Sequence, residues 1–413
     1  MKKTFVSIVL LLSCSFFVSA ADIYVNNSGQ PGTYTSINAA VAAANSGDNV
    51  YISPFSVYTE VISIDKSLSL ISAVSGTNFN VIGGVTIDGF GSGEVKLIGL
   101  SCTGSVNGAI GSSTLFNETV IYIIDCVVNG ASFYNAHHTI VNMYFSTFTG
   151  TSRIHNGDIR GNTFNSYLRV EDGPNLGMGS TVSIIGNHFT GGDIAYLAWY
   201  NDDHYFYIAN NLIEKKGAHI IVSKHHFNTF ENNVIANNTF IPGEDDPCIY
   251  SYCQGTGSIT INSQASSQAN IIFINNLLTW KFGNLVNLTN DLGSTGSSTN
   301  VTKPKLYNNI YYSQSGFHLI AGNVAELYYA ISINPLEERL LDSTYIIDRG
   351  FSSLEYYDID MSTNDIGIHG GPHAIDNYRS SGSGRARVIN LDMPFEIWSG
   401  QTPQVNAKAA HTK

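Results

Sequence analysis

A short pattern of apolar and polar positions recurs along the middle of the chain: an apolar residue, two variable positions, Asn, one variable position and a second apolar residue. Weaker copies centred on Asp125 and Ser146 precede it. The six clear copies follow one another at intervals of 25, 24, 27, 38 and 33, and their asparagines are Asn162, Asn187, Asn211, Asn238, Asn276 and Asn309. Such spacing is typical of solenoids, in which each coil buries its inner face only by stacking on its neighbours.

Each of these six asparagines is predicted to have a structural role at a corner between two strands. Asn tolerates the left-handed backbone conformation that a tight corner needs, and its amide can bond the same residue one coil above. The flanking apolar residues then fill the core, and longer loops leave the coil after Asn238 and Asn276. Because helical periodicity is nearly absent here, the pattern predicts an all-β fold built as a parallel β-helix.

One segment near the N-terminus has helical spacing instead. Ile37, Ala40, Val41 and Ala44 lie at positions i, i+3, i+4 and i+7. We expect a short amphipathic helix that covers the open strand edges of the first coil, which would otherwise pair with other chains.

The first residues predict export. Lys2 and Lys3 precede an apolar run from Phe5 to Ser19, which is too short to span a bilayer comfortably. We expect a signal peptide over residues 1–20, cleaved after Ala20. The alternative is a lipid anchor on Cys14. No later segment is apolar enough to cross a membrane, so we expect no transmembrane segment.

Charge and cysteine content fit an exported β-solenoid. The formal net charge is −12 and charged residues make up 13% of the chain, whereas roughly 25% is usual in globular domains. A chain this acidic is not attracted to nucleic acid, so we expect no nucleic-acid partner. An exported protein can oxidise Cys248 and Cys253 across a loop, and Cys102 and Cys126 are either bridged or stacked as core thiols.

Two parts of the chain resemble a known family. Segments 22–26, 34–41, 47–52 and 57–68 resemble the opening of pectin-lyase-like β-helix proteins, and Asn364–Pro372 is similar to the motif that closes the β-helix in secreted surface proteins of Bacteroidota. The resemblance implies a right-handed parallel β-helix over residues 21–376, followed by an appendage over 377–413. It says little about function, because this superfamily includes esterases, lyases, hydrolases, phage spikes and adhesins.

The motifs of two enzyme classes of this superfamily are absent. The chain contains neither the Asp-Phe-Ile-Phe-Gly motif of methylesterases nor the Asn-Thr-Asp and Gly-His-Gly motifs of polygalacturonases. The sequence therefore argues against both activities.

Counting residues from successive corner asparagines predicts which side chains stack. An unbroken register places Tyr200 beside Lys224 and Asp202 beside His226, all facing one way. Tyr200, Lys224 and His226 then become candidate catalytic residues of a polysaccharide lyase that abstracts a proton next to a uronate, while Asp202 and Asp203 hold Ca²⁺.

A second resemblance bears on this hypothesis. Segment 217–230 resembles a stretch of one alginate and chondroitin lyase family, whose basic Lys matches Lys224. That family places acidic calcium ligands just before the lysine, where this chain has Ala218 and His219, and its partner Arg one coil later is missing. The chain therefore lacks the acidic calcium ligands and the partner Arg of that family's site.

Other polar and aromatic residues are candidates for binding sugar. Aromatic rings stack on sugar rings and arginines pair with sugar acids. The candidate substrate-binding residues are Trp199, Tyr200, His204, Arg153 and Arg160. The competing interpretation is that they are the polar outer face that any solenoid must have.

The last residues predict a β-hairpin. A Ser-Gly-Ser-Gly stretch at 381–384 precedes two short strands within residues 386–410, which resemble the first two strands of an immunoglobulin-like domain. Two strands alone are not stable, so the hairpin either packs on the β-helix or mediates self-assembly or surface attachment.

The sequence favours a secreted or cell-surface β-helix that binds polysaccharide or takes part in extracellular assembly, without catalysis. The alternatives are a calcium-assisted lyase acting on a uronate polymer and a structural fibre subunit.

Overall fold

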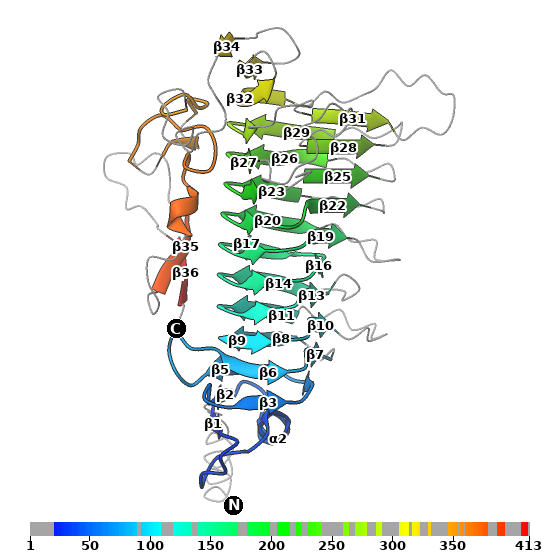
Figure 1. The fold of residues 1–413 in the computed structure, drawn as a ribbon, viewed down its shortest axis with the longest axis vertical. Helices are drawn as coiled ribbons and strands as arrows, with labels where there is room; N and C mark the ends of the chain where they lie inside the picture. The colour runs from blue at the N-terminus through cyan, green and yellow to red at the C-terminus, as the bar shows by residue number, and fades with distance from the viewer. Residues whose placement is uncertain are drawn as a thin grey trace, which may run out of the picture.

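Three columns of short parallel strands form the body of the molecule (Figure 1). The computed structural model describes residues 20–88, 92–108, 119–133, 139–171, 180–198, 205–214, 220–224, 230–241, 259–263, 269–278, 286–290, 305–313, 316–322, 329–331, 346–353, 356–358, 360–378, 386–392 and 406–411. A full coil contributes one strand to each column, and consecutive coils pair in parallel. The predicted all-β parallel solenoid is confirmed, and its right-handedness stays a prediction.

The first column pairs each strand with its counterpart one coil on. Its strands are β1 (Asp22–Val25), β2 (Asn49–Ile52), β5 (Leu68–Ser72), β8 (Gly93–Ile98), β11 (Thr119–Ile124), β14 (Thr139–Tyr144), β17 (Gly157–Arg160), β20 (Thr181–Ile185), β23 (Tyr205–Ala209), β26 (Phe230–Ala236), β29 (Ala269–Ile274) and β32 (Lys305–Ser313).

The second column belongs to the same sheet, across a tight corner. Its strands are β3 (Val57–Thr59), β6 (Phe79–Ile82), β9 (Leu100–Cys102), β12 (Val127–Val128), β15 (Thr147–Phe148), β18 (Thr163–Phe164), β21 (His188–Phe189), β24 (Leu212–Glu214), β27 (Thr239–Ile241) and β30 (Leu277–Leu278).

The third column is a separate sheet. Its strands are β4 (Ile62–Ile64), β7 (Val85–Ile87), β10 (Val106–Gly108), β13 (Ala131–Ser132), β16 (Ser152–Ile154), β19 (Leu168–Glu171), β22 (Ile194–Ala198), β25 (Ile220–Lys224), β28 (Ile259–Ser263) and β31 (Val286–Asn290). Inward residues of the three columns form one continuous apolar core, in which Phe148, Phe164 and Phe189 stack with ring centroids 4.8–4.9 Å apart.

The helix α2 (Ile37–Ala43) lies where the sequence predicts it and buries Ile37, Ala40 and Val41. Asn38 Oδ1 accepts a hydrogen bond from the Ser63 backbone N–H, and Asn38 Nδ2 donates to the Val61 carbonyl. The helix therefore supplies partners to polar groups at the first strand of the third column, β4.

The corner between the first and second columns contains a ladder of asparagines. The Asn187 Nδ2 donates to Asn211 Oδ1 at 3.0 Å, which also accepts from the Asn187 backbone N–H. The same pair of bonds joins Asn162 to Asn187, Asn211 to Asn238, Asn238 to Asn276 and Asn276 to Asn309. All six side chains are at most 1% exposed, so each amide is satisfied inside the wall.

The left-handed residue of each corner lies one position before the ladder asparagine, not on it as the sequence analysis expects. Asn210, Asn237, Asn275 and Asn308 have φ between 48° and 54°, and Gly161 and Gly186 have φ of 65° and 64°. The repeat centred on Asp125 is shifted in the same way: Asp125 has φ 52°, and it is the Cys126 N–H that bonds Ser146 Oγ. Four of these corners therefore contain two consecutive asparagines. The first adopts the left-handed conformation and faces outward, and the second belongs to the ladder.

Cys102 and Cys126 are buried free thiols, so of the two alternatives the structure shows core thiols. Burial raises the pKa of Cys102 to about 11 and that of Cys126 to about 12. Cys248 and Cys253 lie outside the described residues.

The chain returns along the outside of the corner after the last coil. Among the described strands parallel pairing ends at β32, after which β33 (Gly316–Gly322) and β34 (Tyr329–Ile331) pair in antiparallel. The boundary of the β-helix at residue 376 stays a prediction. The described part of residues 346–378, here called the strap, includes the 3₁₀ helix η4 (Ile375–Asn377) and runs back toward the N-terminal end (Figure 1). The hairpin strands β35 (Ala386–Asp392) and β36 (Asn406–His411) pair with each other.

The outward asparagines hold the strap to the corner. Four hydrogen bonds of 2.6–3.1 Å join them to it. At the two upper corners, Asn308 Nδ2 donates to the Arg349 carbonyl and Asn275 Oδ1 accepts from the Phe351 N–H. At the two lower corners, Asn237 Nδ2 donates to Asn364 Oδ1 and Asn210 Nδ2 donates to the Gly370 carbonyl. The predicted closing motif, Asn364–Pro372, therefore binds the side of the solenoid.

None of the helices among the described residues is long and apolar enough to cross a membrane.

Candidate functional site

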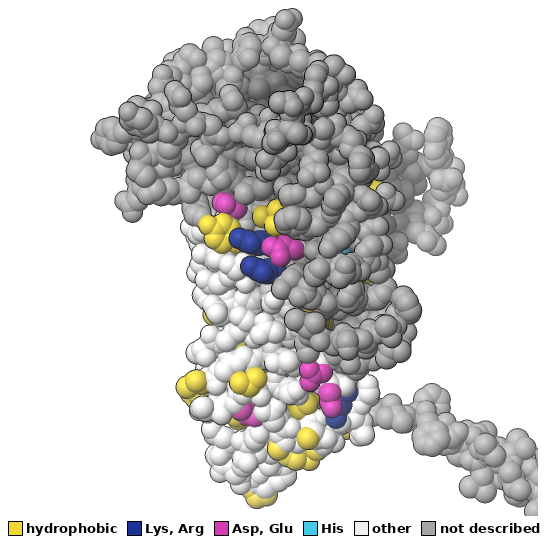
Figure 2. Space-filling view, turned by 90° about the vertical axis from the view of Figure 1, so that its right-hand side faces the viewer, with side chains coloured by type: hydrophobic (Ala, Val, Ile, Leu, Met, Phe, Trp, Pro, Cys, Tyr) yellow, Lys and Arg dark blue, Asp and Glu magenta, His cyan; other side chains and the backbone are white. Residues whose placement is uncertain are grey.

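The outer face of the third column carries two arginines on consecutive coils. Arg153 of β16 pairs in register with Arg169 of β19, so both project outward from one row. The residues before and after them in this row are Ser132 and Ala195, which are small. In Figure 2, which looks onto the side of the third column, basic side chains lie beside acidic and apolar ones near the middle of the molecule. This arginine pair is the candidate site.

Neighbouring side chains hold Arg169 in place. Its guanidinium lies over the Tyr167 ring, 5.6 Å from the centroid, and its Nη1 is 3.5 Å from Glu171 Oε1. The Arg169 side chain is still 36% exposed, while that of Glu171 is 11% exposed. A guanidinium fixed by an aromatic face and one carboxylate keeps further N–H groups for a ligand, since it has five donors.

The site can bind an anion that presents planar carboxylates. Two guanidiniums in one row, on strands about 4.8 Å apart, match a ligand with repeated acid groups better than a single small ion. Arg153 is partly exposed and stands directly below Arg169 in this row. The pair therefore offers guanidinium donors from two adjacent coils on one face of the solenoid.

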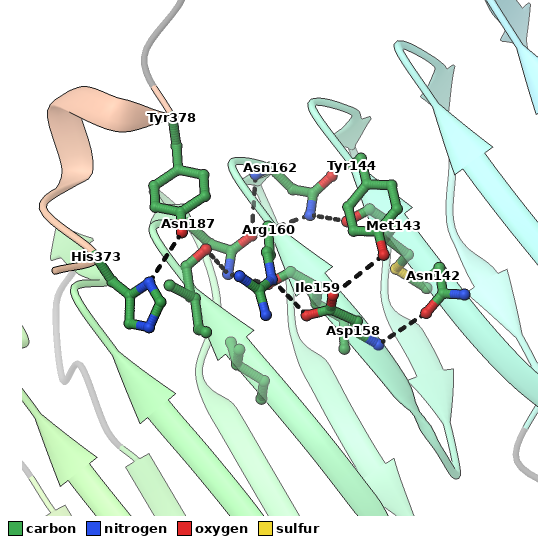
Figure 3. Close-up of polar contacts among 12 residues, drawn as sticks. Asn142, Met143, Tyr144, Asp158, Ile159, Arg160, Asn162, Asn187, His373 and Tyr378 are labelled. Atoms are coloured by element: carbon green, nitrogen blue, oxygen red, sulfur yellow. Dashed lines mark hydrogen bonds and ion pairs between the residues drawn. The ribbon is translucent and has the colours of Figure 1, made fainter. Parts of the chain in front are cut away.

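Arg160, predicted to bind substrate, lies elsewhere and is buried. It ends β17 at the corner and is 6% exposed, with its Nε 2.6 Å from Asp158 Oδ1 (Figure 3). Tyr144 donates to Asp158 Oδ2 at 3.1 Å, and Tyr378 of the strap lies against the same guanidinium. The prediction treats Arg160 as a surface residue and misses the strap, which covers it.

This buried cluster shifts the pKa of several groups. Burial, and next the Asp158 charge, raises the pKa of Tyr144 far above its usual range. Burial, and next the Arg160 charge, lowers the pKa of His373 to about 4, and the His373 Nδ1 lies 3.3 Å from Tyr378 Oη. Both Tyr144 and His373 are held neutral near pH 7, and the cluster serves to attach the strap.

The predicted stacking of Tyr200 on Lys224 is wrong. Lys224 pairs with Ala198 on one side and Ser263 on the other. His188 pairs with Leu212, an offset of 24 in the numbering, whereas Ile194 pairs with Ile220, an offset of 26. Two extra residues therefore enter after β24, and that insertion breaks the register on which the lyase hypothesis depends.

The other residues proposed for catalysis, sugar binding or calcium lie outside the described residues: Trp199, Tyr200, Asp202, Asp203, His204 and His226. Within the part of the chain that the structure describes, no group of three or more His, Cys, Asp or Glu side chains is arranged to hold a metal ion.

Sequence reasoning identified Arg153 but missed Arg169, Tyr167 and Glu171. A repeat in the chain contains the missing signal, because residues 146–154 read Ser-Thr-Phe-Thr-Gly-Thr-Ser-Arg-Ile and residues 162–170 read Asn-Thr-Phe-Asn-Ser-Tyr-Leu-Arg-Val. Their first members, Ser146 and Asn162, are bonded across the corner at an offset of 16 in the numbering. This offset is shorter than the spacing of the clear copies. Counting residues forward from Asn187 therefore does not detect the short coil that pairs Arg153 with Arg169.

No family model and no curated protein matches the sequence. Among solved structures, the chain is similar to the pectin methylesterase from Aspergillus niger, with 13% sequence identity, coverage of 73% of this chain and 87% of that chain, and a TM-score of 0.24. A likeness at this level carries no argument about function, so the fold rests on the strand pairing itself.

Proposed function

We propose that this protein is an exported β-helix that binds acidic polysaccharide on the outer face of its third column. The observation that carries the proposal is the register pairing of Arg153 with Arg169, beside the partly exposed Tyr167. Uronate carboxylates accept bidentate hydrogen bonds from guanidinium groups, and a tyrosine ring packs against sugar rings. The binding face then lies on the solenoid wall and requires no catalytic group.

Export is supported by the contacts of Ala21. Its backbone nitrogen donates to Asp48 Oδ1 at 2.7 Å, and the Asp48 side chain, 2% exposed, also accepts from the Asn45 N–H. The Ala21 bond, followed by the Asn45 bond, lowers the pKa of Asp48. Cleavage after Ala20 would turn this nitrogen into an ammonium group beside a buried carboxylate, which is a favourable partner. Sequencing the N-terminus of the exported protein tests this, with Ala21 as the expected first residue.

Affinity electrophoresis in gels containing polygalacturonate, alginate or a neutral glucan tests the binding proposal. The wild-type chain should be retarded by at least one uronate polymer and not by the neutral glucan. Arg153→Gln and Arg169→Gln should each weaken binding about tenfold, roughly the contribution of one charged hydrogen bond. Added salt should weaken binding, because the pairs are exposed.

Lys96→Gln is the matched control. Lys96 lies on the outer face of the first column, 2.7 Å from Glu94, and its loss changes the net charge by the same amount. Equal loss of binding in this variant and the two arginine variants would contradict a site on the third column, as would wild-type mobility in every gel.

The lyase alternative retains one observation: the Lys224 backbone belongs to the same sheet as the arginine pair. Ultraviolet absorbance of the unsaturated product, measured with the polymers that bind, separates the two functions. A signal that disappears in Lys224→Ala would establish the lyase.

A further inference from the structure

The last outward-facing residue of each first-column strand belongs to one row that runs along the stack. The burial of this row changes where the strap ends. Under the strap, Ile185, Ala209 and Ile274 are at most 2% exposed, and Phe351 and Tyr356 of the strap pack on this row. The strap's last described residue is Tyr378, whose ring lies against Gly186 and whose Cβ lies near Gly161. The covered part of the row therefore ends at the coil of Arg160.

Apolar side chains continue beyond that point along the same row. Register pairing runs from Arg160 to Tyr144, Ile124 and Ile98. Tyr144 is buried by Tyr122, Ile124 and Phe145, which are themselves only partly buried. Ile98, Tyr122, Ile124 and Phe145 are called the lower patch. It continues the interface that the strap occupies.

The chain after the strap is long enough to reach this patch. Seven residues separate Tyr378 from β35, so the start of the hairpin lies within about 27 Å of Tyr378, or roughly five coils. Figure 1 shows β35 and β36 on the same side of the stack as the strap and nearer the N-terminal end. The length of the linker therefore allows the hairpin to reach the lower patch.

The register of the hairpin gives it one mostly apolar face. Val388 pairs with Ala409 and Leu391 with Ala407, and a bulge lies between Val388 and Asn390. Directly opposed residues of an antiparallel pair belong to one face, so the register assigns these four residues to one face with Ala386 and His411. It assigns Arg387, Asn390, Asp392 and Lys408 to the other. Because a two-stranded sheet is not stable without a surface to pack on, this face needs an occupant.

We propose that the β35–β36 hairpin docks in cis, with its apolar face on the lower patch, and so completes the cover that the strap begins. The contact extends the established interface by the coils of β14, β11 and β8 and gives the hairpin the apolar surface that it lacks. It is independent of the proposed glycan site, which lies on the third column.

A double-mutant cycle in the full chain tests the proposal. Ile124→Ser, Leu391→Ser and the double variant are compared by Tm. Docking predicts that the double variant loses clearly less Tm than the two single losses added together, because each single change removes the same contact. The matched control is Val127→Ser: Val127 is 41% exposed on the same coil but across the corner, so its effect should add to that of Leu391→Ser.

Cross-linking gives a second readout that does not depend on stability. A bismaleimide should join Ile124→Cys to Leu391→Cys within one chain in dilute solution, as read by mass spectrometry of peptides. Additive Tm losses, or cross-links found only between chains together with a dimer in light scattering, would overturn docking in cis. The second of these results would assign the hairpin to self-assembly.

Discussion

Arg153 and Arg160 lie on consecutive strands, β16 and β17, yet only Arg160 is covered by the strap. Arg153 faces outward from the third column, in register with a second arginine. Arg160 faces outward from the first column, but the strap covers it and Asp158 and Tyr378 hold it. The difference teaches that position on a coil does not decide whether an outward residue is available to a ligand. A segment that returns from beyond the last coil decides it.

The largest expected effect follows from breaking the buried pair. Arg160→Ala leaves the Asp158 carboxylate, 18% exposed, without its cation, and should cost about 3–5 kcal/mol of unfolding free energy. Denaturant unfolding measures it. Glycan binding, measured under folded conditions, should be unchanged. A loss below about 1 kcal/mol would mean that the pair behaves like a surface ion pair, and the comparison with Arg153 would fail.

The second-largest expected effect is a fall in stability at acidic pH, caused by His373 under the strap. His373 faces Tyr378, Arg160 and Tyr207, and its folded pKa of about 4 lies below the unfolded value of 6.5. Between these values the unfolded chain binds a proton that the folded chain does not, so stability falls as the pH drops from 6.5 to 4, by up to about 3 kcal/mol.

Asp358 opposes this effect. Burial raises its pKa to about 6, so the folded chain binds the extra proton between pH 6 and 3.8 and gains stability as the pH falls. The measurement is therefore the difference between the wild-type chain and His373→Gln across pH 7 to 4. The variant should lose less stability than the wild type as the pH falls. Parallel curves of unfolding free energy against pH would show that protonation of His373 does not affect folding.

A smaller effect is expected at the corner under the strap. In Gly186→Ala the new Cβ would clash with the Tyr378 ring, and φ is +64°, so we expect a loss of about 1–3 kcal/mol. Gly29→Ala is the control, because Gly29 has φ +71° and nothing within 4 Å of the new atom. Thermal unfolding measures both variants, and the excess loss in Gly186→Ala over Gly29→Ala reports the contact with the strap. Equal losses would show that the Tyr378 ring moves aside without a cost in stability.

The smallest effect on stability should come from Arg153→Ala. Arg153 is partly exposed, and the polar interactions of exposed charged side chains contribute about 0–1 kcal/mol. Its thermal unfolding should therefore stay close to that of the wild type while binding to acidic polymer falls. A loss comparable to that of Arg160→Ala would remove the distinction between the two arginines.

The coil could be predicted from the sequence because its cause is local. The inward apolar residues and the ladder asparagines repeat in every coil, so their spacing reveals both the core and the corner. Register was less secure, since a shift of one residue exchanges the two faces of a strand. The weak copy of the repeat is centred on Asp125, whereas the residue bonded across the corner is Cys126. Two residues inserted after β24 also pair Lys224 with Ala198 in place of Tyr200.

The candidate site could be predicted only in part. Arg153 was found as a charged residue, but its partner Arg169 required the short coil between Ser146 and Asn162 to be recognised. The burial of Arg160 has no local cause, because Tyr378 is distant in the sequence and the strap has no periodicity. Such a contact depends on the path of the chain after the last coil. The closing motif Asn364–Pro372 marks that the β-helix ends, but not which side of the solenoid the following residues cover.

The strap also changes how the solenoid should respond to force and heat. In an ordinary repeat protein each unit touches only its neighbours, so the ends fray one unit at a time. Here one segment is bonded to corners from Asn308 down to Asn210 and lies against Gly186 and Gly161 below them. A pull on the chain beyond Tyr378 first loads the coil of Arg160 in the middle of the stack, and the last coils stay shielded until the strap peels away. Because the strap links several coils to one another, the C-terminal coils should unfold together as one cooperative unit.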